Sequence, residues 1–268
     1  MLRLSAGSLL TLGLWPGALR AEGDAQGEDF SFIAVNDLHY IDEKCGAWLQ
    51  TAIAKMKAAS PKAELCLMSG DCTDHGTAAE LAATRDLFQG LSFPTYGVIG
   101  NHDWLKHNDR TPYEQVFPNR INYRFDHRGW QFLALDTTEG QKGGATKISE
   151  ETLRWVDDTL PKLDPKKPLI LISHFPLGPK IPNRSLNADA LLERFKQHNL
   201  RAVFCGHFHG FTESQQGEAV FTTDKCCSFK RMNHDGTKEK GFFVCEAKNG
   251  AIKRTFVEVP VPAENSRP

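Results

Sequence analysis

Two histidines, His207 and His209, stand one residue apart between two glycines in the segment CGHFHG (205–210). A histidine that only fills a protein core usually comes singly among apolar neighbours. A neutral imidazole nitrogen binds transition metals, and the same ring can act as an acid or a base near neutral pH. The pair therefore predicts a site, and its partners must come from other parts of the chain.

Side chains of the same kinds follow five apolar runs of the sequence. The runs are FSFIAV (30–35), ELCLMSG (64–70), PTYGVIG (94–100), PLILIS (168–173) and RAVFC (201–205). The residues that follow them are Asp37, His39, Asp71, Asn101, His102, Asp103, His174, His207 and His209. Each alone could be a helix cap, a turn residue or a half-buried histidine. Because ligands of α/β sheets bind beyond the carboxyl ends of strands, the five together predict a metal site.

The number of donors indicates two metal ions rather than one. The nitrogen and oxygen donors are seven side chains, namely Asp37, His39, Asp71, Asn101, His174, His207 and His209. That set suits two ions about 3.5 to 4 Å apart if one carboxylate bridges them, an arrangement that activates water and neutralises a phosphoryl group. The set contains no thiolate, which favours iron, manganese, zinc or cobalt over copper or a cluster, and so many imidazoles disfavour calcium.

The elements that must position these residues alternate between strands and helices. Helical patterns cover 44–59, 77–89, 149–160 and 188–199, and the apolar runs between them read as strands, which indicates a parallel sheet. A hairpin is expected over 121–138 with Arg128 and Gly129 at its turn, and residues 218–259 predict three or four antiparallel strands. We therefore expect two sheets packed face to face with helices outside.

Composition and charge limit the classes of partner. The chain has 268 residues, of which 40% are hydrophobic and 24% charged, enough for one large domain. The 32 Lys and Arg residues nearly balance the 33 Asp and Glu residues, so no electrostatic footprint for nucleic acid or an anionic membrane is present. We expect no nucleic-acid partner, and the sequence predicts no oligomeric state.

The first 25 residues have the layout of a secretory signal peptide. An early Arg3 precedes an apolar stretch broken by Gly, Ser and Pro, and small residues follow. The stretch is too short and too interrupted for a transmembrane span. We expect export to the periplasm or the medium, with a single domain over 28–260 and a tail over 261–268. The modest hydrophobicity of the stretch would also suit a twin-arginine signal, although the sequence shows only Arg3. A membrane anchor and a cytoplasmic chain with a disordered leader are the alternatives.

The seven cysteines are too few for a disulfide scaffold in a chain of this length. No CxxC pair occurs, which excludes zinc ribbons and thioredoxin-type redox sites. Cys66 and Cys205 stand in apolar runs and are expected to be buried. Cys226 and Cys227 could form a vicinal bridge, but we expect them to lie on opposite faces of a strand.

In this order, DLH, GDCTD, GNHD, the histidine of SHFPL and GHFH resemble the calcineurin-like metallophosphoesterase superfamily. The resemblance implies a four-layer α/β/β/α sandwich of two mixed β-sheets. It also implies that Asp37, His39 and His209 hold one metal, that Asn101, His174 and His207 hold a second, and that Asp71 bridges them.

The resemblance further implies a catalytic mechanism. A metal-bridging hydroxide would attack phosphorus, and His102 would stabilise the developing charge and protonate the leaving oxygen. Asp103 would fix the tautomer of His102.

The branch of the superfamily is indicated by segments around the motifs. GDCTDHG, SHFPL and NADALLERF look most like bacterial class III cyclic-nucleotide phosphodiesterases and their glycerophosphodiesterase relatives. We expect a phosphodiesterase; the alternatives are a pyrophosphatase of ADP-ribose or nucleotide sugars, a phosphomonoesterase, and a non-catalytic binding protein on the same fold. Two polar stretches, 104–120 and 177–187, are expected to select the substrate through their basic residues, which are Lys106, His107, Arg110, Lys180 and Arg184.

Overall fold

The computed structural model describes residues 27–261, so the predicted signal peptide and residues 262–268 lie outside it. The helices are α1 (Glu43–Ala59), α2 (Ala78–Phe88), α3 (Thr111–Val116), α4 (Glu150–Thr159) and α5 (Ala188–Glu193), with short 3-10 helices η1 (Gln89–Leu91), η2 (Asn101–Asp103), η3 (Lys106–Asn108) and η4 (Leu160–Lys162). The strands are β1 (Phe30–Val35), β2 (Ala63–Met68), β3 (Thr95–Gly97), β4 (Tyr123–His127), β5 (Trp130–Leu135), β6 (Leu169–Ser173), β7 (Leu200–Cys205), β8 (Thr212–Gln216), β9 (Ala219–Thr223), β10 (Gly241–Lys248) and β11 (Ala251–Glu258).

The strands form two mixed sheets. The first has the order β11-β10-β1-β2-β3, in which β1, β2 and β3 are parallel and β10 and β11 antiparallel. The second has the order β4-β5-β6-β7-β9-β8, in which β5, β6, β7 and β9 are parallel and the two edge strands antiparallel. Both sheets therefore direct several strand carboxyl ends toward one region.

The two sheets pack face to face through an aromatic and aliphatic core. Phe32 of β1, Trp130 and Phe132 of β5 and Phe204 of β7 belong to one buried cluster, and Phe32 and Phe204 meet edge to face at 5.7 Å. Successive residues of β2 alternate between this core and the helices: Leu67 joins the inter-sheet cluster, and Cys66 and Met68 join the cluster under α1 and α2. The alternation makes each sheet apolar on both faces.

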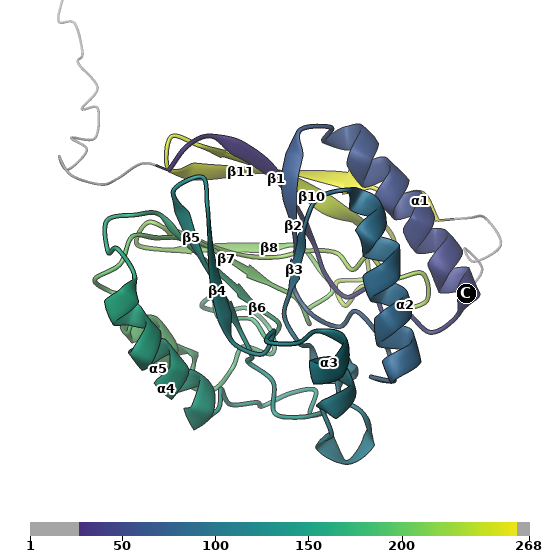
Figure 1. Cartoon of the computed structure of the whole chain (residues 1–268), viewed down its shortest axis with the longest axis horizontal. Coiled ribbons are helices and arrows are strands. Elements are labelled where there is room, and N and C mark those ends of the chain that lie inside the picture. Colours follow the sequence, from purple (N-terminus) through teal and green to yellow (C-terminus); the bar gives the residue numbers. More distant parts are fainter. Residues whose placement is uncertain (1–26, 262–268) are drawn as a thin grey trace, which may run out of the picture.

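Helices cover the outer face of each sheet, so the expected four-layer sandwich is confirmed (Figure 1). Side-chain caps begin these helices where the sequence places polar residues. Thr77 accepts a hydrogen bond from the backbone of Glu80, and Asp42 and Ser149 cap α1 and α4 in the same way. Among residues 27–261 no helix combines the length and the apolar character needed to cross a membrane.

Three details differ from the sequence-based expectations. The helix expected over 188–199 ends at Glu193, because the following amides bond to carbonyls three residues back and tighten the chain into turns. The last strands are not all antiparallel, since β9 pairs in parallel with β7.

Cys226 and Cys227 lie in the irregular segment after β9 rather than on a strand. Each has a free thiol, as do the other five cysteines, and all seven are buried. The predictions for Cys66 and Cys205 are therefore confirmed, and the vicinal bridge is not formed.

We expect Phe132→Ala to lower the free energy of unfolding by about 3 to 5 kcal/mol, because it opens a cavity between the sheets where Phe132 is 0% exposed. Urea unfolding followed by circular dichroism, with a chelator present to remove the contribution of metals, measures the change. Leu186→Ala, at a side chain that is 60% exposed, is the control and should change the value by less than about 0.5 kcal/mol. A loss below about 1 kcal/mol for Phe132→Ala would contradict the described inter-sheet packing.

Candidate metal centre

The turns after β1, β2, β6 and β7 are held together by short bonds between the two sheets. The backbone N–H of Asp37 donates to Gly70 O at 3.1 Å within the first sheet. Across the sheets, His174 Nδ1 donates to Ser69 O at 2.9 Å, and the N–H of His207 donates to both carboxylate oxygens of Asp37 at 3.1 Å. The sheets therefore meet at these strand ends.

Four residues of the expected site have backbones in the left-handed region. Their φ angles are 52° for Asp37, 48° for His39, 50° for Asp71 and 65° for His207. Such conformations cost about 1 to 3 kcal/mol each for residues with a Cβ and persist where the surrounding structure holds them. The turns bend the chain sharply enough to aim consecutive side chains at one point.

Two glycines allow backbone segments to approach the centre. A Cβ on Gly100 would lie 2.1 Å from Asp71 Oδ1, and one on Gly206 would lie 2.3 Å from Ser69 O. Since real Cβ atoms do not come this close, any other residue would push these turns apart. The glycines of GNHD and GHFH are therefore required by packing at the centre.

Six of the seven predicted ligands form two groups that meet at Asp71, and Asn101 lies beside the second group. Asp37, His39 and His209 can present donor atoms to one point, and Asp71, His174 and His207 to another. Asp71 Oδ2 lies 3.6 Å from His39 Nε2, and Asp71 Oδ1 lies 3.4 Å from His174 Nε2. One carboxylate thus turns one oxygen to each group, the arrangement that a bridging ligand needs.

The donor atoms of the first group fit a cation. His39 Nδ1 bonds to Asp74 Oδ1 at 3.0 Å and His209 Nδ1 to Met232 O at 3.0 Å, so both rings turn Nε2 toward the centre. The two Nε2 atoms lie only 3.2 Å apart. Two nitrogen lone pairs at this distance repel unless a proton or a metal ion lies between them.

The second group shows the same convergence of acceptors. Asn101 Oδ1 lies 3.0 Å from His174 Nε2 and 3.1 Å from His207 Nδ1. Because His174 Nδ1 donates to Ser69 O, its Nε2 is the free acceptor and faces another acceptor. His207 Nε2 is buried without a hydrogen-bond partner among the described residues. This set of imidazole, amide and carboxylate donors also fits a transition-metal ion.

Without a metal the pKa values of the cluster are strongly shifted. Burial disfavours the charged ring of His209, but the charge of Asp37 and a hydrogen bond to it outweigh this and raise the pKa of His209 to about 11. Burial lowers the pKa of His39 to about 4 and that of His207 to about 3. Burial, together with the negative charge of Asp37, raises the pKa of Asp71 well above its ordinary value. A bound cation would therefore compete with protons for these atoms.

Asp74 and Arg231 support the first group from outside. Asp74 Oδ1 accepts both the bond from His39 Nδ1 and one from Arg231 Nε at 2.9 Å. Burial alone would raise the pKa of Asp74, but the bonds from His39 and Arg231 hold it below its usual range. Asp74 is the last residue of GDCTD, whereas nothing in the sequence near Arg231 signals this contact.

The ring of His102 is oriented by a different residue from the one expected. His102 Nδ1 lies 3.1 Å from the carbonyl oxygen of Asp74 and 3.7 Å from its carboxylate. Asp103 Oδ1 instead accepts bonds from the backbone and hydroxyl of Thr73, and Oδ2 accepts one from Gly100 N. The prediction that Asp103 fixes the tautomer of His102 is therefore wrong. Asp103 ties the GDCTD turn to the GNHD turn.

A cleft of about 540 Å³ opens over the two groups. It is lined by His39, Asp71, Asn101, His102, Gly143, Asn183, His207, His209, Lys230, Arg231, Met232 and His234. None of the five basic residues expected to contact substrate is among these described lining residues. Segment 230–234 provides the cationic wall instead, and it was missed because it is an irregular stretch between β9 and β10 without a motif.

The five basic residues have other surroundings. Arg184 bonds to Leu177 O in its own loop and to Asp189 at the start of α5, and Arg110 lines a separate polar cleft with Trp104 and Asp136. Lys106, His107 and Lys180 are exposed. Of the two stretches, only the second reaches the described lining of the metal-centre cleft, through Asn183.

Comparison with protein families assigns residues 30–211 to the model described as calcineurin-like phosphoesterase. A protein of Arcobacter nitrofigilis named as a probable glycerophosphodiester phosphodiesterase is 28% identical over 185 residues, which cover 65% of this chain and 67% of the relative. A 3',5'-cyclic-nucleotide phosphodiesterase of Nostoc is 27% identical over 164 residues, which cover 58% of this chain and 59% of the relative.

Solved structures share the fold at low sequence identity. A dimetal phosphatase from Danio rerio has a TM-score of 0.60 and 16% identity, over 81% of this chain and 92% of that one. A purple acid phosphatase from yellow lupin has a TM-score of 0.62 and 14% identity, over 87% of this chain and 52% of that one. These similarities support the sandwich architecture.

Metal affinity should increase with pH. His209, with a pKa of about 11, keeps its proton between pH 6 and 8, so a bound ion must displace that proton. We expect the affinity for Mn²⁺ to rise by about tenfold per pH unit over this range, with release of one proton from His209. Calorimetric titration in buffers of different ionisation enthalpy measures both quantities. An affinity independent of pH would show that the ion does not replace this proton.

Removing the support of His39 should weaken metal binding. We expect Asp74→Ala to lower the affinity for Mn²⁺ by about 10- to 100-fold, because the ring of His39 loses the acceptor that orients it. Equilibrium dialysis measures the affinity. Asp126→Ala, which removes an exposed carboxylate from β4, is the matched control and should have no effect. Equal affinities for the two variants would mean that Asp74 does not support the centre.

Proposed function

Because the chain belongs to the calcineurin-like phosphoesterase family and is therefore a metal-dependent hydrolase of phosphate esters, we propose that its substrates are phosphodiesters. The proposal is supported most directly by the placement of Asp71 between two groups of donors, with His102 at the same cleft. The names of the relatives, a glycerophosphodiester and a cyclic-nucleotide phosphodiesterase, favour diesters over monoesters.

We propose that the cluster holds two ions of iron, manganese or zinc. Asp37, His39 and His209 would hold one ion, Asn101, His174 and His207 the other, and Asp71 would contact both. Bound ions would polarise the phosphoryl group and lower the pKa of water, which are the two contributions that hydrolysis of a phosphate ester needs. The Asp74 carboxylate and the carbonyls of Ser69 and Met232 keep the ligand rings in the required tautomers.

His102 would donate a proton to the leaving oxygen. Its side chain is 32% exposed in the cleft, and its backbone N–H donates to Asp71 Oδ1 at 2.8 Å. Since Nδ1 donates to the carbonyl of Asp74, Nε2 is the nitrogen available to a substrate, and it would donate a proton from the imidazolium form of the ring. Proton transfer from a positioned group contributes about 10²- to 10⁴-fold, most for alcohols that leave poorly.

The substrate would enter beside segment 230–234. Arg231 is fixed by Asp74 while its guanidinium borders the cleft, and His234 stacks on His209 with ring centroids 4.3 Å apart. A planar, always charged guanidinium suits the non-bridging oxygens of a phosphate. Export of the enzyme rests on residues 1–25 alone and remains a prediction.

The proposal is tested with a substrate panel and added Mn²⁺, Zn²⁺ or Fe²⁺. The panel contains a bis-aryl phosphodiester, an aryl monoester, a cyclic nucleotide, a glycerophosphodiester and ADP-ribose. We expect the highest kcat/KM for one of the diesters. Faster turnover of ADP-ribose or of the monoester would favour the pyrophosphatase or phosphomonoesterase alternatives, and no turnover with full metal loading would favour a binding protein.

His102→Ala should lower kcat for a diester with an alkyl leaving group by about 10²- to 10⁴-fold, and much less for the aryl diester, with the same metal content. His127→Ala is the matched control. The ring of His127, on β4, pairs with Glu64 of β2 and does not line the cleft. Normal turnover of poor leaving groups by His102→Ala would rule out His102 as the acid.

A further inference from the structure

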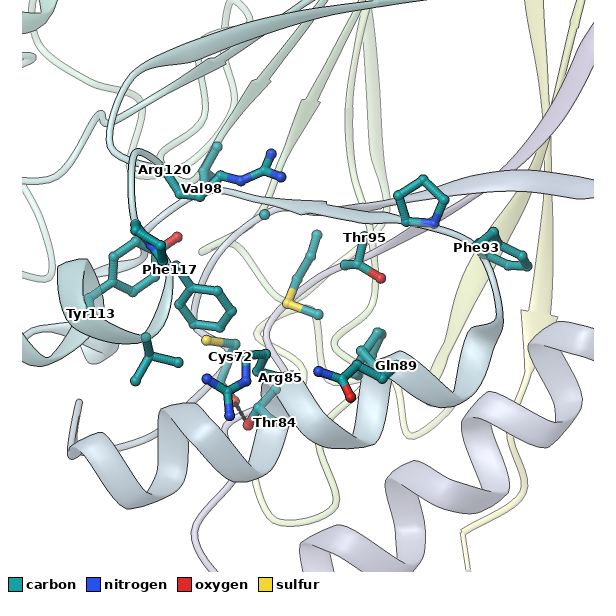
Figure 2. A pocket seen from close by; sticks show the side chains of 16 residues that line it. Cys72, Thr84, Arg85, Gln89, Phe93, Thr95, Val98, Tyr113, Phe117 and Arg120 are labelled. Atoms are coloured by element: carbon teal, nitrogen blue, oxygen red, sulfur yellow. Dashed lines mark hydrogen bonds between the residues drawn. The ribbon is translucent and has the colours of Figure 1, made fainter.

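A second cavity lies on the helix-covered face of the first sheet, away from the seven predicted ligands. It has a volume of about 380 Å³ and lies between α2, the end of β2, β3 and the segment of α3 that continues to Arg120. Figure 2 shows α2 on one side of it and the strand with Thr95 and Val98 on the other. The volume falls within the range of roughly 300 to 1,000 Å³ that is usual for small-molecule sites.

The walls of the cavity are mostly apolar and aromatic. They include Met68, Phe88, Phe93, Tyr113, Val116 and Phe117. Tyr113 and Phe117 also contact each other, with ring centroids 5.0 Å apart. Surfaces of this kind favour the apolar part of a ligand, because burying it removes apolar area from water.

The charged groups of the cavity are cationic. Arg85 of α2 and Arg120 lie at opposite walls (Figure 2), and no acidic residue is among the lining residues that the structure describes. Arg120 is held in place by two rings, with its guanidinium carbon 5.1 Å from the centroid of Tyr96 and 4.5 Å from that of Tyr123. Gln89 and Thr95 add neutral hydrogen-bonding groups (Figure 2).

Arg85 has a partner that a ligand could replace. Its guanidinium contacts Asp86 at 2.8 Å, and the two side chains are 42% and 59% exposed. Exposed pairs of this kind contribute little to stability, so exchanging Asp86 for the carboxylate of a ligand costs little. A hydrogen bond between a guanidinium and a carboxylate is stronger than one between neutral groups.

We propose that this cavity binds a small organic carboxylate with an apolar chain or ring. The carboxylate contacts Arg85 or Arg120, and the apolar body lies against Phe88, Tyr113 and Phe117. The site is distinct from the metal centre but adjoins it, since Cys72 lines the cavity and its thiol lies 3.1 Å from Asp103 Oδ1. Binding at this site does not depend on the proposed phosphodiesterase activity.

The test uses two fluorescent probes of nearly the same shape and the full chain. 8-Anilinonaphthalene-1-sulfonate is anionic and N-phenyl-1-naphthylamine is uncharged. We expect the anionic probe to bind with one-to-one stoichiometry and to be displaced by decanoate. Replacing both cationic groups, Arg85→Gln with Arg120→Gln, should weaken the anionic probe by about tenfold or more and leave the uncharged probe within about twofold.

Val116→Trp should fill the cavity and weaken both probes by about tenfold or more. Arg124→Gln is the control, because this exposed arginine bonds to Lys162 O on the far side of the β4 hairpin and does not line the cavity. Thermal unfolding and far-ultraviolet circular dichroism confirm that each variant is folded. If Val116→Trp does not fold, the arginine pair still provides the test.

Three results would each overturn the proposal. The first is no saturable binding of the anionic probe by the parent chain. The second is an unchanged affinity for that probe in the double arginine variant. The third is an affinity for both probes in a folded Val116→Trp variant that equals their affinity for the parent chain, which would place the probes elsewhere on the surface.

Discussion

The structure depends on a cluster of buried acceptors that only cations can hold together. Asp37 and Asp71 are almost completely buried, and imidazole nitrogens of His39 and His209 face each other at 3.2 Å. Buried carboxylates and opposed lone pairs are strongly unfavourable without positive charge between them. Burial and the charge of Asp37 raise the pKa of Asp71, and the charge of Asp37 outweighs burial to raise the pKa of His209. A bound metal ion would supply positive charge to the same atoms, and its binding would then stabilise the folded strand ends.

The two-sheet sandwich is the means by which these acceptors are concentrated. The carboxyl ends of β1 and β2 in one sheet meet those of β6 and β7 in the other, and His174 and His207 bond across to Ser69 and Asp37. The left-handed backbones at the turns would be costly elsewhere, but here the inter-sheet contacts hold them. The buried aromatic core between the sheets stabilises the packing of the two sheets, and this packing holds the turns in their left-handed conformations. The residues between the sheets thus stabilise the fold, and the residues at the strand ends form the candidate metal centre.

Some residues around the centre orient the predicted ligands, and others border the cleft through which a substrate would enter. Asp74 connects His39, His102 and Arg231, so one carboxylate orients a predicted ligand, approaches the predicted acid and fixes a cationic side chain at the cleft. Asp103 has a different task, because it joins the turns that carry Asp71 and Asn101. Segment 230–234, far along the chain from the motifs, forms the wall that a substrate would pass. None of the basic residues of the two predicted stretches is among the described residues that line this wall.

The sequence by itself determined the fold class, the alternation of strands and helices and the residues that meet at the centre, because the motifs stand directly after apolar runs whose ends must share one edge. Even the capping of α2 by Thr77 followed from local residue types. Only the tertiary structure decided the contacts between segments distant in sequence: Asp74 rather than Asp103 beside His102, Arg231 at the cleft, and the parallel pairing of β9 with β7. Local patterns encode which side chains leave a strand end, but a hydrogen bond between residues 157 positions apart depends on how the sheets and loops pack.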